Sequence, residues 1–278
     1  MLDQTLSDEL FNKISAYIGK NVGIKLPKEK HLMVQSRLAS RLKALSFKSY
    51  EDYLNFVFSD SPEAQEEMIS MIDVITTNLT HFFREEPHFD YLTQSVFPEL
   101  AEKGIKVPEI WSAGCSSGQE PYTLSIVTLE YMRKNPNKFQ DFKILATDIS
   151  TKMLAKAASA VYPIESIEKI PKDILKRHFL RGKDGIRVRI KPETRQKVSF
   201  QRLNFMDPDF SVSPKKDVIF CRNVLIYFEK STQFKVISQL LNNLNPGGYL
   251  FLGHSETIFG MDLPIKTVAP TVFKKVQE

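Results

Sequence analysis

Residues 110–122 read Ile110-Trp-Ser-Ala-Gly-Cys-Ser-Ser-Gly-Gln-Glu-Pro-Tyr122. The short apolar run predicts a strand, and the small residues after it predict a tight turn that leads into a helix. Gly114 and Gly118 lack a Cβ, so the backbone there can pass close to a ligand or take a positive φ. Their G-x-x-x-G spacing, followed by the carboxylate of Glu120, differs from the G-x-G-x-x-G turn that binds a pyrophosphate. The pattern favours a ligand without phosphates, such as an adenosyl cofactor, although an ordinary strand–turn–helix connection explains two glycines equally well.

Predicted strands and helices alternate from about residue 105 onward, which indicates a parallel sheet covered by helices and an α/β fold. We expect strands at Glu109–Ala113, Lys143–Thr147, Val198–Leu203, Asp217–Cys221, Tyr249–Leu252 and Thr271–Lys275. We expect helices at Glu120–Lys134, Thr151–Ala158, Lys172–Phe179 and Thr232–Leu244. The last helix should stop at Asn245-Pro-Gly-Gly248, because Pro and Gly end helices.

The part of the chain before this alternation shows only helical spacing of its apolar residues, with capping-type starts at Ser7 and Ser49. We therefore assign residues 1–78 to an all-α domain and residues 79–278 to the sheet domain. Within the latter, Gly185–Ile190 alternates at period two and precedes another basic stretch. This pattern predicts a small antiparallel β-ribbon inserted at about residues 181–201.

Composition limits the class of protein. The chain has 278 residues, a net charge of +5 and two cysteines, Cys115 and Cys221, each inside a motif rather than in a spaced pair. We therefore expect no disulfide framework or zinc site, and a reducing cytoplasmic location. No apolar run reaches membrane-spanning length and no leader pattern opens the chain, so we expect no direct membrane insertion.

Basic residues gather in two clusters, and each is either a solvated face or a surface that docks an acidic partner. Arg37 and Arg41, four apart, share one helix face in the first cluster. The first cluster is Lys25, Lys28, Lys30, Arg37, Arg41, Lys43 and Lys48, and the second is Lys176, Arg177, Arg181, Lys183, Arg187, Arg189, Lys191, Arg195 and Lys197. Together they favour docking of an acidic protein surface.

Polar residues stand just beyond the predicted carboxyl ends of four strands: Glu120, Asp148, Asn204 and Asn223. Ligands of open α/β sheets bind at that edge, where a carboxylate such as Asp148 can accept both ribose hydroxyls. Helix capping is a compatible role for Asp148. Phe205 follows Asn204 and offers an aromatic face. The four strand ends predict one nucleoside-sized pocket.

The segment Thr76-Thr-Asn-Leu-Thr-His-Phe-Phe-Arg-Glu85 joins the two predicted domains. A capped helix start explains its hydroxyl and amide groups, but two Phe and an Arg are unusual in a plain linker. The planar guanidinium of Arg84 pairs well with carboxylates. We expect it to hold the carboxylate of a cofactor or to orient an acidic substrate.

Five motifs together resemble the chemotaxis receptor methyltransferase (CheR) family, and the resemblance covers nearly the whole chain. They are Thr-Thr-Asn-Leu-Thr-x-Phe-Phe-Arg-Glu, Ser-Ala-Gly-Cys-Ser-x-Gly-x-Glu-Pro-Tyr, Ala-Thr-Asp-Ile, Phe-Cys-Arg-Asn-Val-x-Ile-Tyr-Phe and Gly-His-Ser-Glu. The resemblance implies a Rossmann-like S-adenosylmethionine-dependent methyltransferase sheet with an inserted small antiparallel β-subdomain, after an all-α domain that docks receptors. It implies S-adenosylmethionine as methyl donor and receptor glutamates as acceptors, so the partners are the cytoplasmic domains of chemotaxis receptors.

The same resemblance implies the site residues. By motif position, cofactor contacts fall on Asn78, Thr80, Arg84, Glu120, Asp148, Asn204, Phe205, Asn223 and Val224. The catalytic-region pair falls on Arg84 and Tyr227. Ser117 and Gln119 depart from the family's more frequent Thr and Glu, and the loop Arg181–Gly185 is shorter than in members that grip a receptor's C-terminal tail.

Other functions fit the sequence less well. A nucleic-acid amino-methyltransferase typically carries an Asn/Asp-Pro-Pro-aromatic loop, whereas this chain has Arg222-Asn-Val-Leu at the corresponding strand end. Cys221 follows three apolar residues, which indicates a buried core thiol rather than a nucleophile. The chain lacks the third glycine of the turn that nicotinamide oxidoreductases use. A receptor adaptor without catalysis would not need the cofactor motifs. The five histidines show no metal-ligand spacing, so we expect no metal. The missing Pro-Pro loop and the buried Cys221 lead us to expect no nucleic-acid partner.

Overall fold

The computed structural model describes residues 5–76 and 78–276; Thr77, within the Thr76–Glu85 segment, lies outside the described residues. The N-terminal domain is all-α, as predicted, and packs its helices around a shared apolar core. Ser7, Ser49 and Ser61 each accept a backbone N–H three residues ahead and so start a helix. The helices are α1 (Asp8–Val22), α2 (His31–Ala44, after the short 3₁₀ turn Lys28–Lys30), α3 (Tyr50–Val57) and α4 (Pro62–Ile75).

Two basic residues of α2 have partners inside this domain, which corrects the expectation that they belong to a docking face. Arg41 makes a two-pronged ion pair with Glu67 at 2.9 and 2.5 Å, and Tyr53 donates to the same carboxylate at 2.7 Å. Arg37 Nη1 donates to the carbonyls of Ile75 and Thr76 at 2.6 and 3.0 Å. Both guanidinium groups therefore fasten α2 to α4, and their charge serves the fold.

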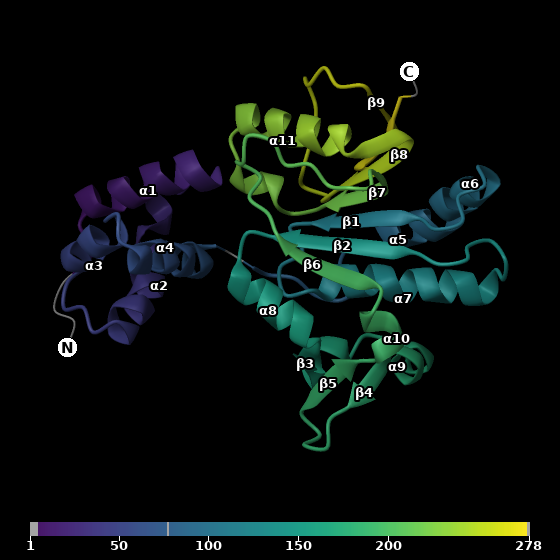
Figure 1. Cartoon of the computed structure of the whole chain (residues 1–278), viewed down its shortest axis with the longest axis horizontal. Helices are drawn as coiled ribbons and strands as arrows, with labels where there is room; N and C mark the ends of the chain where they lie inside the picture. Colours follow the sequence, from purple (N-terminus) through teal and green to yellow (C-terminus); the bar gives the residue numbers. More distant parts are fainter. Residues whose placement is uncertain (1–4, 77, 277–278) are drawn as a thin grey trace.

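The second domain is built on a seven-stranded sheet with the order β6-β2-β1-β7-β8-β10-β9 (Figure 1). β10 runs antiparallel to β8 and β9 antiparallel to β10, while the other neighbours are parallel. The strands are β1 (Glu109–Ala113), β2 (Lys143–Asp148), β6 (Val198–Arg202), β7 (Lys216–Cys221), β8 (Leu244–Leu252), β9 (Ile265–Ala269) and β10 (Val272–Lys275). Strand order reverses between β1 and β7, which is where ligands of such sheets bind.

Helices cover both faces of this sheet, because successive strand residues point to opposite faces. Trp111 of β1 packs toward α11 (Lys230–Asn242), whereas Ile110 packs toward α7 (Gln119–Lys134). The Ile110 face is also covered by α5 (Pro87–Tyr91), a π-helical turn (Leu92–Val96) and α6 (Phe97–Glu102). The predicted Rossmann-like α/β fold is confirmed.

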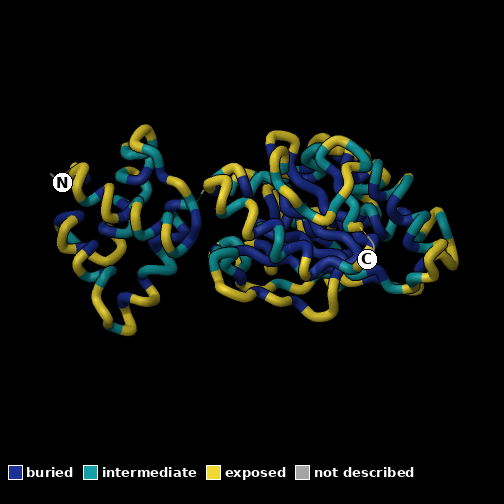
Figure 2. Tube along the Cα trace, turned by 90° about the horizontal axis from the view of Figure 1, so that it is seen from above, coloured by how far each residue is buried: buried dark blue, intermediate teal, exposed yellow. Residues whose placement is uncertain are grey.

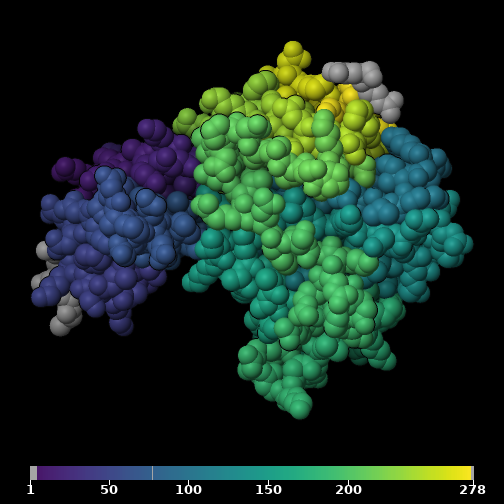
Figure 3. Space-filling model, in the orientation of Figure 1, coloured from purple at the N-terminus to yellow at the C-terminus, as the bar shows by residue number. Residues whose placement is uncertain are grey.

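A small three-stranded antiparallel sheet projects from this domain (Figures 1 and 3). Its order is β3-β5-β4, from β3 (Val161–Pro163), β5 (Arg187–Ile190) and β4 (Phe179–Arg181). The predicted bounds of 181–201 are wrong, because the subdomain begins at β3 and the later residues form α10 (Pro192–Arg195) and β6 of the main sheet. A three-residue strand such as β3 carries too little alternation to be recognised. α8 (Thr151–Ser159) leads into β3, and α9 (Lys172–His178) leads into β4.

Three other element predictions need correction. Asn245-Pro-Gly-Gly248 lies within β8, not in a helix-ending turn, because Leu244 already pairs with Lys216 and the ladder resumes at Tyr249 after an irregularity. The edge strand β9, between Pro264 and Pro270, was not predicted. Nor were the helices of residues 87–102, whose continuous course includes a π turn.

The two domains meet along the carboxyl edge of the sheet and appear as two lobes in Figure 2. Lys25 N–H donates to the Tyr227 carbonyl at 2.8 Å, beside an isolated bridge between Ile24 and Phe228. Asp73 of α4 accepts from the Thr151 hydroxyl and the Lys152 N–H, both at 3.2 Å, at the start of α8. The segment after α1 therefore lies against the edge where a ligand is expected.

Candidate active site

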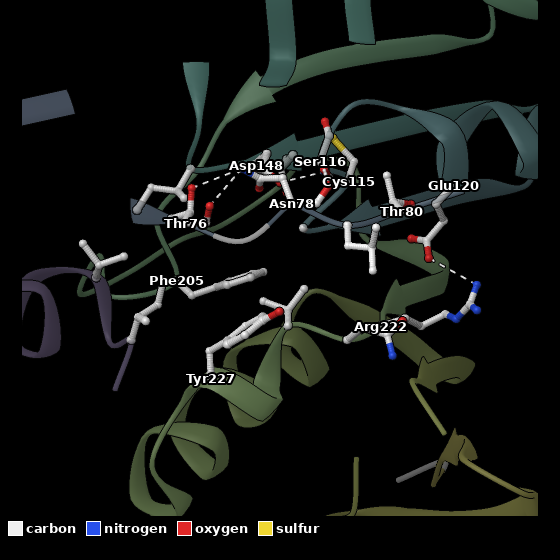
Figure 4. A pocket seen from close by; sticks show the side chains of 18 of the residues that line it. Thr76, Asn78, Thr80, Cys115, Ser116, Glu120, Asp148, Phe205, Arg222 and Tyr227 are labelled. Atoms are coloured by element: carbon white, nitrogen blue, oxygen red, sulfur yellow. Dashed lines mark hydrogen bonds and ion pairs between the residues drawn. The ribbon is translucent and has the colours of Figure 1, made fainter. Parts of the chain in front are cut away.

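A pocket lies at the carboxyl ends of β1, β2, β6 and β7, and the N-terminal domain forms part of its wall (Figure 4). About 1100 Å³ of space free of protein atoms lies among its lining residues, the open mouth included. All ten residues predicted to bind cofactor or acceptor line it: Asn78, Thr80, Arg84, Glu120, Asp148, Asn204, Phe205, Asn223, Val224 and Tyr227.

The turn after β1 lines the pocket with Gly114, Cys115 and Ser116, at the position where the glycine pattern predicted a tight turn. Gly114 and Gly118 have φ values of 88° and 93°, which L-residues with a Cβ rarely adopt. A Cβ on Gly114 would lie 2.4 Å from a methyl of Val224, and one on Gly118 would lie 2.8 Å from Ala157. The close approach that requires Gly114 is therefore to the loop after β7, so the glycine joins two walls of the pocket.

Asp148 ends β2 and is buried. Its two carboxylate oxygens accept the backbone N–H groups of Ser116 at 2.7 Å and Ser150 at 2.9 Å. Burial raises the pKa of Asp148, and these two N–H bonds partly offset that rise. α8 is capped by Ser150, not by Asp148. Each carboxylate oxygen can accept more than one hydrogen bond, so Asp148 can hold the turn and still receive hydroxyl groups.

Arg222, just beyond β7, links two acids and is the main site residue that the sequence analysis left without a role. Its side chain is 1% exposed. It contacts Glu120 at 3.2 Å and Glu85 at 3.1 Å, and it also donates to the carbonyl of Arg84. Glu120 in turn accepts from the Ser112 hydroxyl at 2.7 Å. A cation directly after the apolar run Val218–Cys221 was the signal available in the sequence.

The two acids respond differently to this arginine. Burial raises the pKa of Glu120, and the charge of Arg222 only partly opposes it. Burial also acts to raise the pKa of Glu85, but Arg222 and a hydrogen bond from Asn223 outweigh it and lower the pKa. Glu85 is therefore a firmly ionised partner of Arg222, while Glu120 is the acid that would gain most from a further cationic partner.

Arg84 lies on a sharply bent segment, between Phe83 and Glu85, which both have φ values of 56°. Its Nη1 donates to the carbonyl of Leu79 at 2.9 Å. Arg222 holds this bend through the Arg84 carbonyl, and Arg84 lines the pocket.

Glu256, in the Gly-His-Ser-Glu motif, holds the loop after β7. It accepts the backbone N–H groups of Asn223 and Val224 at 2.9 Å and that of Leu225 at 2.7 Å. Asn223 has a φ of 58°, and the carboxylate of Glu256 fixes it in that conformation. Burial raises the pKa of Glu256, and the N–H bonds partly offset the rise. This motif thus supports the site from outside the pocket lining.

Phe205 and Tyr227 supply aromatic rings on the side of the pocket opposite Asp148 (Figure 4). Lys30 Nζ lies 5.3 Å from the centroid of the Tyr227 ring. The Asn204 amide donates to the Asn21 carbonyl at 2.8 Å, and its oxygen accepts the Met206 N–H at 3.0 Å. Asn204 therefore connects the pocket to the end of α1.

The pocket fits S-adenosylmethionine in the chemistry of its lining. Asp148 presents a buried carboxylate at a strand end, where ribose hydroxyls can be received. The aromatic rings of Phe205 and Tyr227 offer flat apolar surface to a base. Glu120 and Arg84 offer an anion and a cation to the two charged groups of an amino acid. The polar lining groups are the kinds that an adenosyl amino acid needs.

Comparisons with known proteins match both domains. The family model of the CheR methyltransferase SAM binding domain matches residues 78–273, and that of the CheR methyltransferase all-alpha domain matches residues 9–76. A chemotaxis protein methyltransferase of Borreliella burgdorferi is 40% identical over 272 residues, which are 96% of this chain and 94% of the relative. One of Escherichia coli is 35% identical over 271 residues, 96% of this chain and 91% of the relative.

Similarity to solved structures is weak. PKMT2 from Rickettsia typhi in complex with AdoHcy is 18% identical with a TM-score of 0.33, over 58% of this chain and 25% of that one. The family models and the curated relatives instead span nearly the whole chain. The protein therefore belongs to the CheR family of methyltransferases, with S-adenosylmethionine as its cofactor.

Proposed function

We propose that the protein transfers a methyl group from S-adenosylmethionine to glutamate side chains on the cytoplasmic domains of chemotaxis receptors and forms glutamate methyl esters. The observation that carries this proposal is the convergence of all ten predicted residues on one pocket at the sheet edge. The relatives, which are chemotaxis protein methyltransferases by name, support a role in chemotaxis. We place the reaction in the cytoplasm, where such receptor domains lie.

No helix among residues 5–76 and 78–276 combines the length and the apolar character needed to cross a bilayer.

We assign cofactor contacts to the nine residues Asn78, Thr80, Arg84, Glu120, Asp148, Asn204, Phe205, Asn223 and Val224. Asp148 would receive the ribose hydroxyls, and Phe205 would lie against the base. Glu120 would bind the amino group, because it is a pocket-lining acid whose pKa is raised by burial and only partly lowered by the charge of Arg222. Arg84 would bind the carboxylate end or orient the acceptor.

The proposed reaction requires little acid–base catalysis from the protein's side chains. A glutamate carboxylate is ionised near neutral pH, so no general base is required to create the nucleophile. The cofactor supplies a methyl group activated by a positively charged sulfur. The chain's own residues must align the acceptor with that methyl group and restrict its motion. Opposite charges are consumed in the transfer, so a site with little water favours it.

Tyr227 and Arg84 are the residues that we propose to orient the acceptor. The Tyr227 ring lines the pocket, and Lys30 stands over it with a positive charge. A phenolic hydroxyl can donate to a carboxylate without neutralising it, which leaves the nucleophile reactive.

We further propose that the N-terminal domain docks the acidic receptor surface through exposed lysines of the first basic cluster. Arg37 and Arg41 are excluded because they bond within the domain. Lys28, Lys43 and Lys48 remain exposed on the same domain. They leave a positive surface on the domain that also forms a wall of the pocket.

The function is tested with methyl-labelled cofactor and receptor-containing membranes. We expect label on receptors that mild base releases as methanol, since esters are base-labile. Base-stable label, or label on added nucleic acid, would refute the proposal; cofactor binding without transfer would instead indicate an adaptor.

Replacing Tyr227 by Phe tests the residue assignment in the same assay. We expect kcat to fall roughly tenfold or more, because an orienting hydrogen bond is removed, while the Kd for the cofactor changes little. Tyr17→Phe, in the N-terminal domain, is the matched control and should keep wild-type kcat. An unchanged kcat for Tyr227→Phe would remove Tyr227 from the proposed pair.

A further inference from the structure

Three metal-ligating side chains meet beside the pocket, from parts of the chain far apart in sequence. One ligand atom from each of Glu85, His88 and His254 lies within 4.8 Å of the others. Glu85 Oε2 is 3.5 Å from His88 Nδ1 and 4.0 Å from His254 Nε2. Glu85 follows the domain connection, His88 lies in α5, and His254 follows β8. The separation of 166 residues between the two histidines hid this cluster from spacing rules.

His88 is held in the orientation that a metal ligand needs. It is 2% exposed, and its ring packs edge-on against Phe251 at 5.6 Å between centroids. Its Nε2 lies 2.9 Å from the Thr271 hydroxyl, while Nδ1 is buried without a hydrogen-bond partner. Metal-binding histidines usually bond through their other ring nitrogen to a second group, which fixes the ring. The unpartnered nitrogen of His88 faces Glu85.

The separations are close to those of a tetrahedral site. Metal–ligand bonds of about 2.0 Å place tetrahedral ligand atoms roughly 3.3 Å apart. The distances of 3.5 and 4.0 Å need only a small contraction. The side chain of His254 is 52% exposed, so it can make that adjustment and leave a route for an ion to enter.

We propose that Glu85, His88 and His254 form a binding site for a transition-metal dication, with Zn²⁺ the best match to two imidazoles and one carboxylate. None of the three residues lines the cofactor pocket, so the site is separate from it. It uses three protein ligands and leaves a position open to water. The expectation of no metal rested on the spacing of histidines in the sequence, whereas the fold brings together ligands that are far apart in the sequence.

The site is coupled to the pocket through Arg222. Arg222 and Asn223 line the pocket, and both donate to the carboxylate of Glu85. The cation of Arg222, paired with Glu85, opposes binding of a dication, so we expect weaker Zn²⁺ binding than at a structural zinc site. A metal that draws on Glu85 leaves Arg222 to pair more tightly with Glu120. On the cofactor placement proposed above, bound Zn²⁺ therefore weakens cofactor binding.

Zn²⁺ binding to the full chain, free of any histidine tag, is the test. Titration against a chromophoric chelator should give one Zn²⁺ per chain, and His254→Ala should weaken binding tenfold or more. His81→Ala removes an exposed histidine four residues before Glu85 and should leave the Kd unchanged. Equal Zn²⁺ affinity in wild type and His254→Ala, or an equal loss in His81→Ala, would overturn the site. Co²⁺ in place of Zn²⁺ should give a visible spectrum with nitrogen ligands, which His254→Ala abolishes.

Cofactor affinity measured with and without saturating Zn²⁺ tests the coupling separately. We expect Zn²⁺ to raise the cofactor Kd roughly fivefold or more, and His254→Ala to remove this effect. Zn²⁺ bound at the site with an unchanged cofactor Kd would overturn the coupling and leave the site standing. His88→Gln supplies a second ligand variant, to be read only where its unfolding temperature matches wild type.

Discussion

Gly114 shows how one absent methyl group shapes the pocket. Its φ is 88°, and a Cβ would lie 2.4 Å from Val224. Gly114→Ala should therefore incur backbone strain of about 1–2 kcal/mol and overpacking of about 1–3 kcal/mol. We expect a lower unfolding temperature and weaker cofactor binding, measured by thermal melts and calorimetry.

Gly104→Ala is the matched control for that substitution. Gly104 has a similar φ of 79°, but no atom lies within 4 Å of the Cβ position. It should show the strain alone, with cofactor affinity unchanged. If both variants lost the same stability and the same affinity, the contact with Val224 would not matter.

Arg222 should tolerate no substitution, not even one that keeps its charge. Arg222→Lys retains a cation, but a single ammonium cannot reach Glu85, Glu120 and the Arg84 carbonyl together. Breaking a buried ion pair costs about 3–5 kcal/mol, so we expect a large fall in unfolding temperature and weaker cofactor binding. Arg181→Lys, at an exposed position of β4, should change neither. Wild-type cofactor affinity in a folded Arg222→Lys chain would contradict the role of the three-way contact.

Individual pocket residues were predictable where a motif marked them, and supporting residues were not. Asp148 ends β2 and Asn223 lies two residues beyond β7, so their place at the sheet edge followed from chain order. Arg222 and Glu85 depend on a pairing across 137 residues of sequence, which no local pattern contains. The same holds for Glu256, whose carboxylate caps a loop more than 30 residues away.

α7 anchors the small β-subdomain through one carboxylate. Glu130 of α7 pairs with Arg177 of α9 at 2.6 Å and with His178 at 2.9 Å. Burial acts to raise the pKa of Glu130, but hydrogen bonds from Arg177, Arg133 and His178 outweigh it and lower the pKa from 4.5 to about 2. Because the folded pKa is depressed, Glu130 stabilises the fold above about pH 4.5 and loses that contribution as pH falls toward 2.

Glu130→Gln should lose this stabilisation at neutral pH, by roughly 1–3 kcal/mol for the charged hydrogen bonds removed. The difference in unfolding free energy from wild type should shrink between pH 4.5 and 2, which denaturant titrations at several pH values would measure. Glu102→Gln, at an exposed position, is the control and should match wild type throughout. A difference that stays constant with pH would contradict the depressed pKa.

Elements of regular length were predicted to within two or three residues, and short or irregular ones were missed. β1 was placed correctly because its apolar run is bounded by Pro108 and Gly114. β8 was cut short at its start because Pro and Gly normally end elements, whereas here they form an irregularity held by pairing with β7. β3 is a strand because it pairs with β5, and a pairing between segments this far apart could not be predicted from the sequence.

Polar contacts join the two domains alongside apolar packing of Ile24 on the sheet domain and Ile149 on the helical domain, and we expect the polar ones to contribute to the joint. Asp73→Ala would remove the acceptor for Thr151 and Lys152 at the start of α8. We expect faster release of the N-terminal domain by limited proteolysis and weaker cofactor binding, since both domains line the pocket. Asp60→Ala, in an exposed turn of the same domain, should behave as wild type. Unaltered proteolysis of Asp73→Ala would show that other contacts hold the domains together.

Tyr227 and Asn204, both in the pocket wall, also bond to backbone of the first domain, Tyr227 to Lys25 just after α1 and Asn204 to Asn21 in its last turn. Binding of a protein partner to the first domain is therefore coupled in free energy to binding of a ligand in the pocket. Thermodynamic reciprocity then requires that, if bound cofactor raises the enzyme's affinity for its protein target, the target raises the affinity for the cofactor by an equal factor. The receptor would then bind enzyme that carries the cofactor in preference to enzyme without it, and no separate regulator would be needed.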